Sequence, residues 1–217
     1  MATVPIKPEY GPTLGRLLSP RWRAAPPLVR GLVLAACVGL VALLIGAVLT
    51  LENAHYSHSG SVPFSFSYRS LNRVASDAGG YVKVTRRRAD GRLEDSFAVQ
   101  PLRLPPYTGE VSGALPVYAA SYIEALARRY RGFKLYSEGK TRINTIPGYQ
   151  IVYTATVDGQ TMWGRDALLL PPNRARVRDG VDLVMLTSPT ADPKVNSPSE
   201  VASDGELLRP VKTFRFG

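Results

Sequence analysis

The sequence predicts an α+β protein: an antiparallel β-sheet with one main packed helix, preceded by a single transmembrane helix. Residues 31–51 form an apolar run without any charged side chain. Beyond this run, apolar and polar residues alternate in several short segments, which is the period of half-buried strands. One segment after Pro116 instead places its apolar residues at helical spacing. The 217 residues suffice for one globular domain and an anchor.

The apolar run has the length of a bilayer span. At about 1.5 Å of rise per residue, a helix over residues 31–51 extends roughly 30 Å, close to the hydrocarbon thickness of a membrane. A lone segment in lipid satisfies its backbone hydrogen bonds only as a helix. We therefore predict a transmembrane helix over residues 28–51, with membrane contact through residues 31–51.

The charges beside this helix predict its orientation. The cations close to it all precede it, whereas Glu52 follows it and Arg69 is the first cation beyond. By the positive-inside rule, the N-terminus lies in the cytoplasm and the C-terminal domain lies outside. The predicted location is the cytoplasmic membrane, crossed once.

Two alternatives compete with a permanent anchor. A secretory signal has a shorter apolar core and a small-residue cleavage site, which residues 51–54 match poorly. The sequence LAAC ending in Cys37 resembles a lipoprotein box, but about six apolar residues separate Arg30 from Cys37 and fourteen follow it. We therefore favour a buried thiol over lipidation. Because Cys37 is the only cysteine, no disulfide forms within the chain.

The segments on either side of the helix are polar. Residues 1–27 contain six prolines and few apolar groups, which predicts a disordered, Pro/Arg-rich cytoplasmic tail. Residues 52–61 are interpreted as a polar stalk. His55 and His58 within it have an HxxH spacing, but a zinc site needs three or four ligands, so no metal site is predicted. The extracytoplasmic α+β domain is predicted over residues 62–217.

The domain opens with strands. Phe64 to Tyr68 alternate with serines, and residues 81–85 form a second predicted strand. Asp90-Gly91 is a turn dipeptide that leads into a third strand over residues 96–104, so the pair is predicted to form a hairpin. Three consecutive cations, Arg86, Arg87 and Arg88, lie at the end of this hairpin. An exposed hairpin end is the simpler interpretation, and an anion-binding clamp is the alternative.

One helix follows a proline-rich connection over residues 104–115. From Pro116, which suits a first turn, the apolar positions at helical spacing are Val117, Ala120, Ile123, Ala127 and Tyr130, with Ala119 and Leu126 widening the stripe. Arginines near the C-terminal end offset the helix dipole, and Gly132 provides a stop.

The remaining chain returns to strands. We predict a strand region broken near Gly139, a turn at Pro147-Gly148, and a hairpin around Asp158-Gly159. The corresponding strands cover residues 133–146, 149–157 and 161–170. Residues 181–187 are apolar enough for a central strand. Residues 192–204 are polar and contain two prolines, so we predict a loop or at most one helical turn there. Residues 211–216 form a predicted closing strand.

This order of elements resembles a known family. The motifs are PFSFSY at residues 63–68, GYQIVY at residues 148–153 and TFR at residues 213–215. Together with the single middle helix, they resemble the PsbP-like family of extracytoplasmic lipoprotein and membrane-anchored α+β domains. The resemblance spans nearly all of residues 62–217 and consists of order and apolar pattern. It implies a sheet covered by helices and a non-catalytic accessory or assembly role, with no catalytic residues or cofactor to carry over.

The motifs of the common enzyme classes are absent from the sequence. GxSxG, Walker and dinucleotide-binding patterns do not occur, and the predicted outer domain contains no cysteine or histidine. Acidic pairs such as Glu94 with Asp95, and Asp179 with Asp182, are interpreted as solvated turn edges. We therefore predict that the protein is not an enzyme and has no catalytic, cofactor-binding or metal-binding residues.

Two further residues complete the candidate partner or ligand surface. Trp163 and Arg165 are two apart on a predicted strand, so they share a face and join Arg86, Arg87 and Arg88 as its residues. Burial of Trp163 in the core is the simpler interpretation. The formal net charge of +10 suits a protein or an anionic envelope component as partner, and the predicted location argues against nucleic acid.

The predicted function is a non-catalytic extracytoplasmic binding or assembly domain on a single-pass membrane protein. The alternatives are an envelope hydrolase with an unrecognised carboxylate site and a membrane-anchored sensor. The sequence leaves the oligomeric state open.

Overall fold

A computed structural model describes residues 26–49, 54–108, 111–172 and 178–217, without the side chains of residues 30, 44–49, 111 and 112. The chain divides into two units, residues 1–52 and residues 53–217. The predicted disordered tail at residues 1–27 lies, except for its last two residues, outside the described residues.

The first unit contains one helix. Helix α2, Pro27–Leu49, covers most of the segment predicted as a transmembrane helix over residues 28–51. Its described apolar side chains are exposed, among them Leu32 and Val38, and so is the free thiol of Cys37. Within the part of the chain that the structure describes, no helix combines the length and the apolar character needed to cross a membrane.

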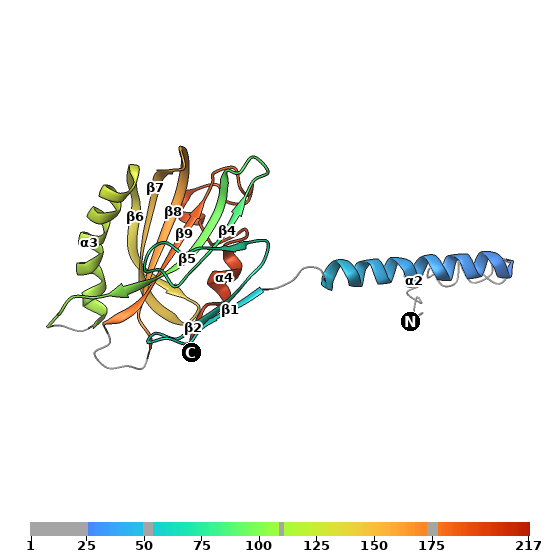
Figure 1. Ribbon diagram of the computed structural model, residues 1–217, viewed down its shortest axis with the longest axis horizontal. Coiled ribbons are helices and arrows are strands. Elements are labelled where there is room, and N and C mark those ends of the chain that lie inside the picture. Colours follow the sequence, from blue (N-terminus) through green and yellow to red (C-terminus); the bar gives the residue numbers. More distant parts are fainter. Residues whose placement is uncertain (1–25, 50–53, 109–110, 173–177) are drawn as a thin grey trace, which may run out of the picture. The chain divides into compact units, whose positions relative to one another are not determined.

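The second unit is an α+β fold built on an antiparallel sheet of seven strands (Figure 1). Their order is β3-β4-β5-β9-β8-β7-β6, and each strand pairs antiparallel with its neighbours. The strands are β3 Asn72–Val74, β4 Val82–Arg87, β5 Leu93–Arg103, β6 Arg131–Ile143, β7 Ile146–Val157, β8 Gln160–Leu169 and β9 Asp179–Thr187.

The two Asp-Gly hairpins are confirmed. Strands β4 and β5 pair on either side of Asp90-Gly91, and β7 and β8 pair on either side of Asp158-Gly159. Asp158 and Gly159 have φ angles of 50° and 76°, the positive values that a two-residue type I′ turn requires. Strand β9 lies between β5 and β8, and all but its first residue are buried, so the predicted central strand is also confirmed.

A second sheet of three strands has the order β1-β2-β10. Its strands are β1 Ala54–His58, β2 Phe64–Tyr68 and β10 Arg215–Phe216. The prediction of a polar stalk over residues 52–61 is therefore wrong for β1, which pairs with β2 along its whole length. The physical reason is alternation: Ala54 and Tyr56 pack against the core, whereas His55 and Ser57 face outward.

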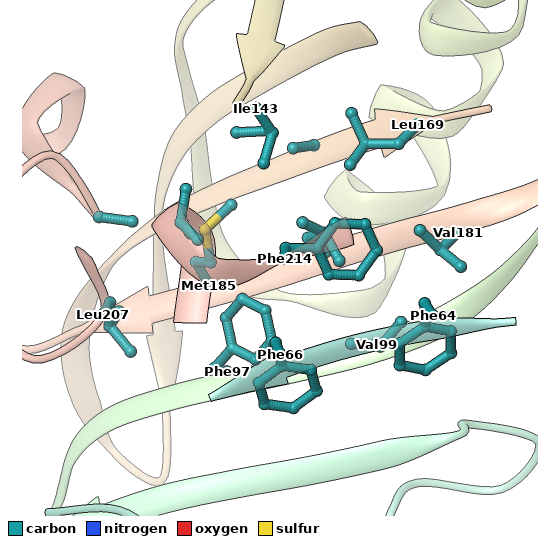
Figure 2. Packing of buried hydrophobic residues seen from close by; sticks show 14 of the residues in the cluster. Phe64, Phe66, Phe97, Val99, Ile143, Leu169, Val181, Met185, Leu207 and Phe214 are labelled. Carbon is teal, nitrogen blue, oxygen red and sulfur yellow. The ribbon is translucent and has the colours of Figure 1, made fainter. Parts of the chain in front are cut away.

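The main core fills the space between the two sheets. Phe66 of β2 lies against Phe97 of β5, Phe64 of β2 belongs to the same cluster, and β9 contributes Val181 and Met185 (Figure 2). The short helix α4, Leu208–Thr213, and the 3₁₀ turn η1, Pro198–Glu200, also border this core. Phe214, which directly follows α4, is fully buried in this core.

The opposite face of the large sheet carries helix α3, Val111–Arg129, which lies beside β6 and β7 (Figure 1). The predicted phase of this helix is only partly right: of the predicted apolar stripe, Ala119, Ile123, Leu126 and Tyr130 pack against the core, and the other members do not. Val117 is 61% exposed, and Ala120 and Ala127 also face solvent, whereas Leu115, Ala119 and Leu126 are buried. The buried stripe is offset because the half-buried rings of Tyr118 and Tyr122 turn toward the sheet. The helix also begins five residues earlier than predicted, so Pro116 lies inside it.

Three further predictions are corrected. Strand β6 continues through Gly139, with its irregularities at residues 131–134 and 135–137. The turn before β7 is at residues 144–145, where Asn144 has a φ of 54°, rather than at Pro147-Gly148. Gly148 lies within β7, and this strand position requires a glycine because an added Cβ would overlap the carbonyl oxygen of Leu168 on β8. The closing strand is shorter than predicted, since residues 211–213 belong to α4.

Candidate functional site

Two aspartates lie beneath helix α3, in the middle of the large sheet. Asp166 belongs to β8 and Asp182 to β9, and Asp182 pairs directly with Leu168, two residues from Asp166. Both aspartates therefore point to the face that α3 covers, as diagonal neighbours. Asp166 is 0% exposed and Asp182 is 3% exposed. Buried carboxyl groups at this depth require specific partners.

Two tyrosines supply those partners. The hydroxyl oxygen of Tyr122 on α3 lies 2.9 Å from Asp166 Oδ2 and 2.5 Å from Asp182 Oδ2. The hydroxyl of Tyr153 on β7 donates to Asp166 Oδ1 at 3.0 Å. Among the described residues, Asp182 Oδ1 has no hydrogen-bond partner. We call these four residues the buried acid cluster.

Burial dominates the electrostatics of this cluster. It raises the pKa of both carboxyl groups, and repulsion between the two disfavours their joint ionisation, against the opposing hydrogen bonds from the tyrosines. Burial and the neighbouring acids also raise the pKa values of Tyr122 and Tyr153 well above their ordinary range. Both phenols are therefore hydrogen-bond donors at neutral pH.

An open pocket of about 440 Å³ lies on the same side of the sheet, beside the C-terminal end of α3. We call it the α3-end pocket and define it by its polar lining residues Asp77, Lys83, Thr85, Arg87, Ser96, Arg129, Tyr130 and Asp158. Its floor is formed by strands β4 and β5. One wall comes from the end of α3 and another from the β7–β8 hairpin.

The pocket combines buried hydroxyl groups with a charged rim. Thr85 and Ser96 pair directly across β4 and β5 and are 4% and 2% exposed. Around them, Asp77 contacts both Lys83 at 3.2 Å and Arg129 at 3.4 Å. The rim carries three cations and two acids among the described lining residues, so it has a small positive excess. Such a surface can bind an acidic group through charge-assisted hydrogen bonds.

The pocket and the buried acid cluster are connected by aromatic contacts. The guanidinium of Arg129 lies 5.4 Å from the centre of the Tyr130 ring. Tyr130 in turn stacks on Tyr153 at a centroid distance of 5.9 Å, and Tyr153 donates to Asp166. The end of α3 thus forms part of the pocket wall and also contacts the cluster.

The three consecutive arginines do not form one patch. Arg86 contacts Asp95 at 2.6 Å, and Arg88 contacts Glu94 at 3.4 Å. Arg87 alone reaches the α3-end pocket, where it lies 3.8 Å from Asp158. A register irregularity between Arg86 and Arg87 accompanies this separation. The assignment of these arginines to a partner surface remains a prediction.

Trp163 and Arg165 share a face of β8, which is directed toward the main core. Trp163 is half-buried and packs against that core. Arg165 donates to the carbonyl of Val201 at 3.0 Å and to the Thr141 hydroxyl at 3.3 Å, and burial lowers its pKa. These contacts tie β8 to the segment after η1. Their assignment to a ligand surface also remains a prediction.

The histidines of the predicted stalk belong to β1. His58 stacks on Phe64 with a centroid distance of 5.1 Å, and His55 Nδ1 lies 3.2 Å from the Ser67 hydroxyl. No group of three or more His, Cys, Asp or Glu side chains suited to a metal ion occurs among the described residues.

Sequence reasoning missed the buried acid cluster. The sequence pattern predicts a solvated turn edge for Asp182, which is wrong because Asp182 is buried, and it does not distinguish Asp166. The available signal was an acidic residue inside an apolar strand, as in VDLVMLT around Asp182 and RDALLL around Asp166. In a strand buried on both faces, such a residue must point into the protein whichever face it takes.

The whole fold is similar to that of solved structures. The solution structure of cyanobacterial PsbP (CyanoP) from Synechocystis sp. PCC 6803 superimposes with a TM-score of 0.52 at 13% sequence identity, covering 77% of this chain and 94% of that one. The fold is PsbP-like.

A second structure, PA94 of Pseudomonas aeruginosa, a protein of unknown function, matches at a TM-score of 0.37 and 15% identity, covering 66% of this chain and 88% of that one. No protein-family model and no curated protein sequence matches the chain. What the PsbP-like fold shares with this chain is therefore architecture: an antiparallel sheet with few helices.

Proposed function

We propose that this protein is a single-pass membrane protein whose PsbP-like outer domain binds an acidic group of a protein or an anionic envelope component, without catalysing a reaction. The observation that carries the proposal is the α3-end pocket, with its buried hydroxyl floor and cationic rim. An accessory or assembly role, as the resemblance to the PsbP family implies, fits such a site.

The pocket favours binding over hydrolysis. The two convergent carboxyl groups of this face, Asp166 and Asp182, are sealed under α3 and engaged by tyrosine hydroxyls. A glycosidase-type pair must instead reach substrate from both sides of the bond that breaks. The acids that do line the pocket, Asp77 and Asp158, each contact a cation.

The membrane part of the proposal rests on the sequence. Residues 31–51 are free of charge, and the nearby cations precede them. We expect the full-length protein in the membrane fraction, with a tag at the N-terminus reported from the cytoplasm and a tag at the C-terminus from outside. Recovery in the soluble fraction, or both tags on one side, would refute the anchor without affecting the pocket.

Binding can be tested with defined acidic probes. Full-length protein in detergent is titrated with polyglutamate and, separately, with polyphosphate, at low and high salt. We expect the variant Lys83→Ala/Arg87→Ala to bind at least about tenfold more weakly, since each lost charge-assisted hydrogen bond costs about 1.5–3 kcal/mol. The matched control is Arg103→Ala, which removes an arginine at the opposite end of β5, where it contacts Asp179 and not the α3-end pocket. Equal binding by all three proteins, or no binding by any, would refute the proposal.

A further inference from the structure

The buried acid cluster has three hydrogen-bond contacts between tyrosine and carboxyl oxygens, but its two tyrosines supply only two hydroxyl hydrogens. The Tyr122 hydroxyl carries one hydrogen, yet its oxygen lies within hydrogen-bond distance of a carboxyl oxygen from each aspartate, at 2.9 and 2.5 Å. An ionised carboxylate only accepts hydrogen bonds. The hydrogen of Tyr122 therefore serves one aspartate, and the other contact needs a hydrogen on a carboxyl group.

We infer that Asp166, Asp182 and Tyr122 together bind one proton, carried by Asp182, and that this proton holds helix α3 on the sheet at neutral pH. Asp182 Oδ2 then donates to the Tyr122 oxygen, and Tyr122 donates to Asp166 Oδ2. The proton comes from solvent when the chain folds. The inference is independent of whether the α3-end pocket binds a ligand.

The hydrogen-bond pattern assigns the proton to Asp182. The two oxygens of Asp166 face two donors, Tyr153 and Tyr122, which is the environment of an ionised carboxylate. Asp182 Oδ1 meets no partner among the described residues. An unpartnered oxygen costs far less on a neutral acid than on a carboxylate.

The surrounding groups cannot neutralise a second charge. The titratable and charged side chains around the cluster are Tyr118, Tyr122 and Arg129 of α3, Tyr130 just after it, and Tyr153 of β7. Gln100 of β5, which pairs with Asp182 in the sheet, is uncharged. Arg129 is the one cation in this set, it is nearly half exposed, and it also contacts Asp77. One partly solvated cation shared with another acid favours one ionised aspartate, not two.

Loss of the proton would act on helix α3. A second buried negative charge would repel Asp166 and remove the hydrogen bond to Tyr122, which belongs to α3. Because Arg129 at the end of α3 lines the α3-end pocket, the same event would loosen a wall of that pocket. We expect helix α3 to detach from the sheet first, while the strands of the sheet stay paired.

Infrared spectroscopy tests the proton directly in the full-length protein. At neutral pH we expect the carbonyl band of a protonated carboxylic acid in the wild type, its loss in Asp182→Asn, and its retention in Asp95→Asn, which removes another buried aspartate of the same sheet. Absence of the band from the wild type, or its persistence in Asp182→Asn, would overturn the inference.

Equilibrium unfolding provides the second measurement. The folded-state pKa of the site lies above the unfolded value of about 4, so folding takes up the proton and stability falls as pH rises from there. Because burial raises the pKa of Asp182 to about 7, we expect the folding equilibrium constant of the wild type to fall by up to about tenfold per pH unit between about pH 4 and about pH 7, and to level off above.

The variant Asp182→Asn supplies a permanent N–H donor to Tyr122. The free energy of unfolding of this variant should depend less steeply on pH than that of the wild type, because folding no longer takes up about one proton. The variant should become the more stable protein at alkaline pH. An unchanged slope in this variant would contradict the inference. If the variant does not fold, the presence or absence of the infrared band in the wild type tests whether the cluster binds a proton.

Discussion

Asp95 is a buried carboxylate whose charge is balanced mainly by one arginine. It is 3% exposed and accepts hydrogen bonds from Arg86 and, at 2.6 Å, from the Thr187 hydroxyl. Burial raises its pKa, while Thr187 and Arg86 act to lower it. The neighbouring Arg87 instead meets Asp158 at a solvent-exposed site. Adjacent arginines therefore have unequal roles, and sequence position alone does not distinguish them.

Substitution of Arg86 tests this difference. We expect Arg86→Ala to lower the free energy of unfolding by about 2–3 kcal/mol, below the full cost of breaking a buried ion pair because Arg86 is partly exposed. The control Arg87→Ala should cost less than about 1 kcal/mol, as exposed pairs do. Urea unfolding at neutral pH measures both changes.

The loss in Arg86→Ala should shrink on acidification. Without its arginine, Asp95 has a higher folded-state pKa, so its protonation offsets the missing cation as pH falls. Equal losses for the two arginine variants would contradict the assigned role of Arg86.

A glycine under the Tyr153 ring provides a second residue-scale prediction. Gly164 pairs with Tyr153 across β7 and β8, and an added Cβ would overlap its ring. We expect Gly164→Ala to destabilise the protein by about 1–3 kcal/mol through overpacking. Gly139→Ala, on the edge strand β6 with open space around it, should change stability by no more than about 0.5 kcal/mol. Thermal or urea unfolding compares them, and similar effects would refute the packing argument.

At the scale of the element, the C-terminal helix α4 is attached to β2 by one side chain. The Thr213 hydroxyl accepts the backbone N–H of Ser67 at 2.8 Å and donates to the carbonyl of Arg209 at 2.8 Å. Asn144 also donates to the carbonyl of Phe214, which follows α4. These bonds position the buried Phe214 and place β10 beside β2.

Removal of the Thr213 hydroxyl should loosen this attachment. In Thr213→Val the shape is nearly kept, but the Ser67 N–H loses its acceptor, which costs about 1–3 kcal/mol. Hydrogen exchange should accelerate at Ser67 and in β10 more than in β9. Thr213→Ser keeps the hydroxyl and serves as the control, with a smaller loss. Uniform acceleration across the sheet would show that the bond does not act locally.

The edge strand β6 explains why the large sheet can end in solvent. It has register irregularities near both Arg131 and Leu135, and it carries Lys134 and Lys140. Bulges and lysines on an edge hinder pairing with another chain. Its exposed Leu135 and Tyr136 thus lie on an edge that is protected against strand addition.

At the scale of the molecule, the folded unit begins earlier than the sequence pattern suggests. Strand β1 places the Tyr56 ring 6.0 Å from Phe64 and 5.6 Å from Phe66, and it covers one edge of β2. The compact unit accordingly begins at residue 53, not at residue 62.

Two fragments test this boundary. A fragment of residues 54–217 retains β1, whereas residues 62–217 leave the edge of β2 and part of the aromatic core uncovered. We expect the shorter fragment to be less stable by about 2–3 kcal/mol, the scale of burying one large aromatic side chain, and to aggregate more readily. Urea midpoints and light scattering measure both effects. Equal urea midpoints would show that β1 does not stabilise the domain and that the folded unit begins at residue 62.

Much of the fold was predictable because its signals are local. The alternation around Phe64, the Asp-Gly turns and the apolar run of β9 each depend on neighbours within a few residues. The phase of α3 was not predictable in this way, since several of its faces carry apolar residues and the tyrosines resemble surface groups. Pro147-Gly148 has the composition of a turn but lies in a strand, because Gly148 allows a close approach to β8.

The candidate sites depend on contacts between distant segments. The buried acid cluster joins residues 122, 153, 166 and 182, and the α3-end pocket joins residues from 74 to 186. Of the predicted surface residues, Arg87 reaches the pocket, whereas Arg86 and Arg165 have partners elsewhere. No spacing along the chain indicates which acids meet a tyrosine and which meet water.

The sequence by itself determined the strand periods, the two hairpin turns and the apolar segment that precedes the domain, since each arises from residues adjacent in the chain. Only the tertiary structure decided that β1 joins the fold, which face of α3 is buried, and that two aspartates share one tyrosine. The physical reason is that the protonation and hydrogen bonding of a buried polar group depend on neighbours in space, and sheet pairing brings these together from distant positions.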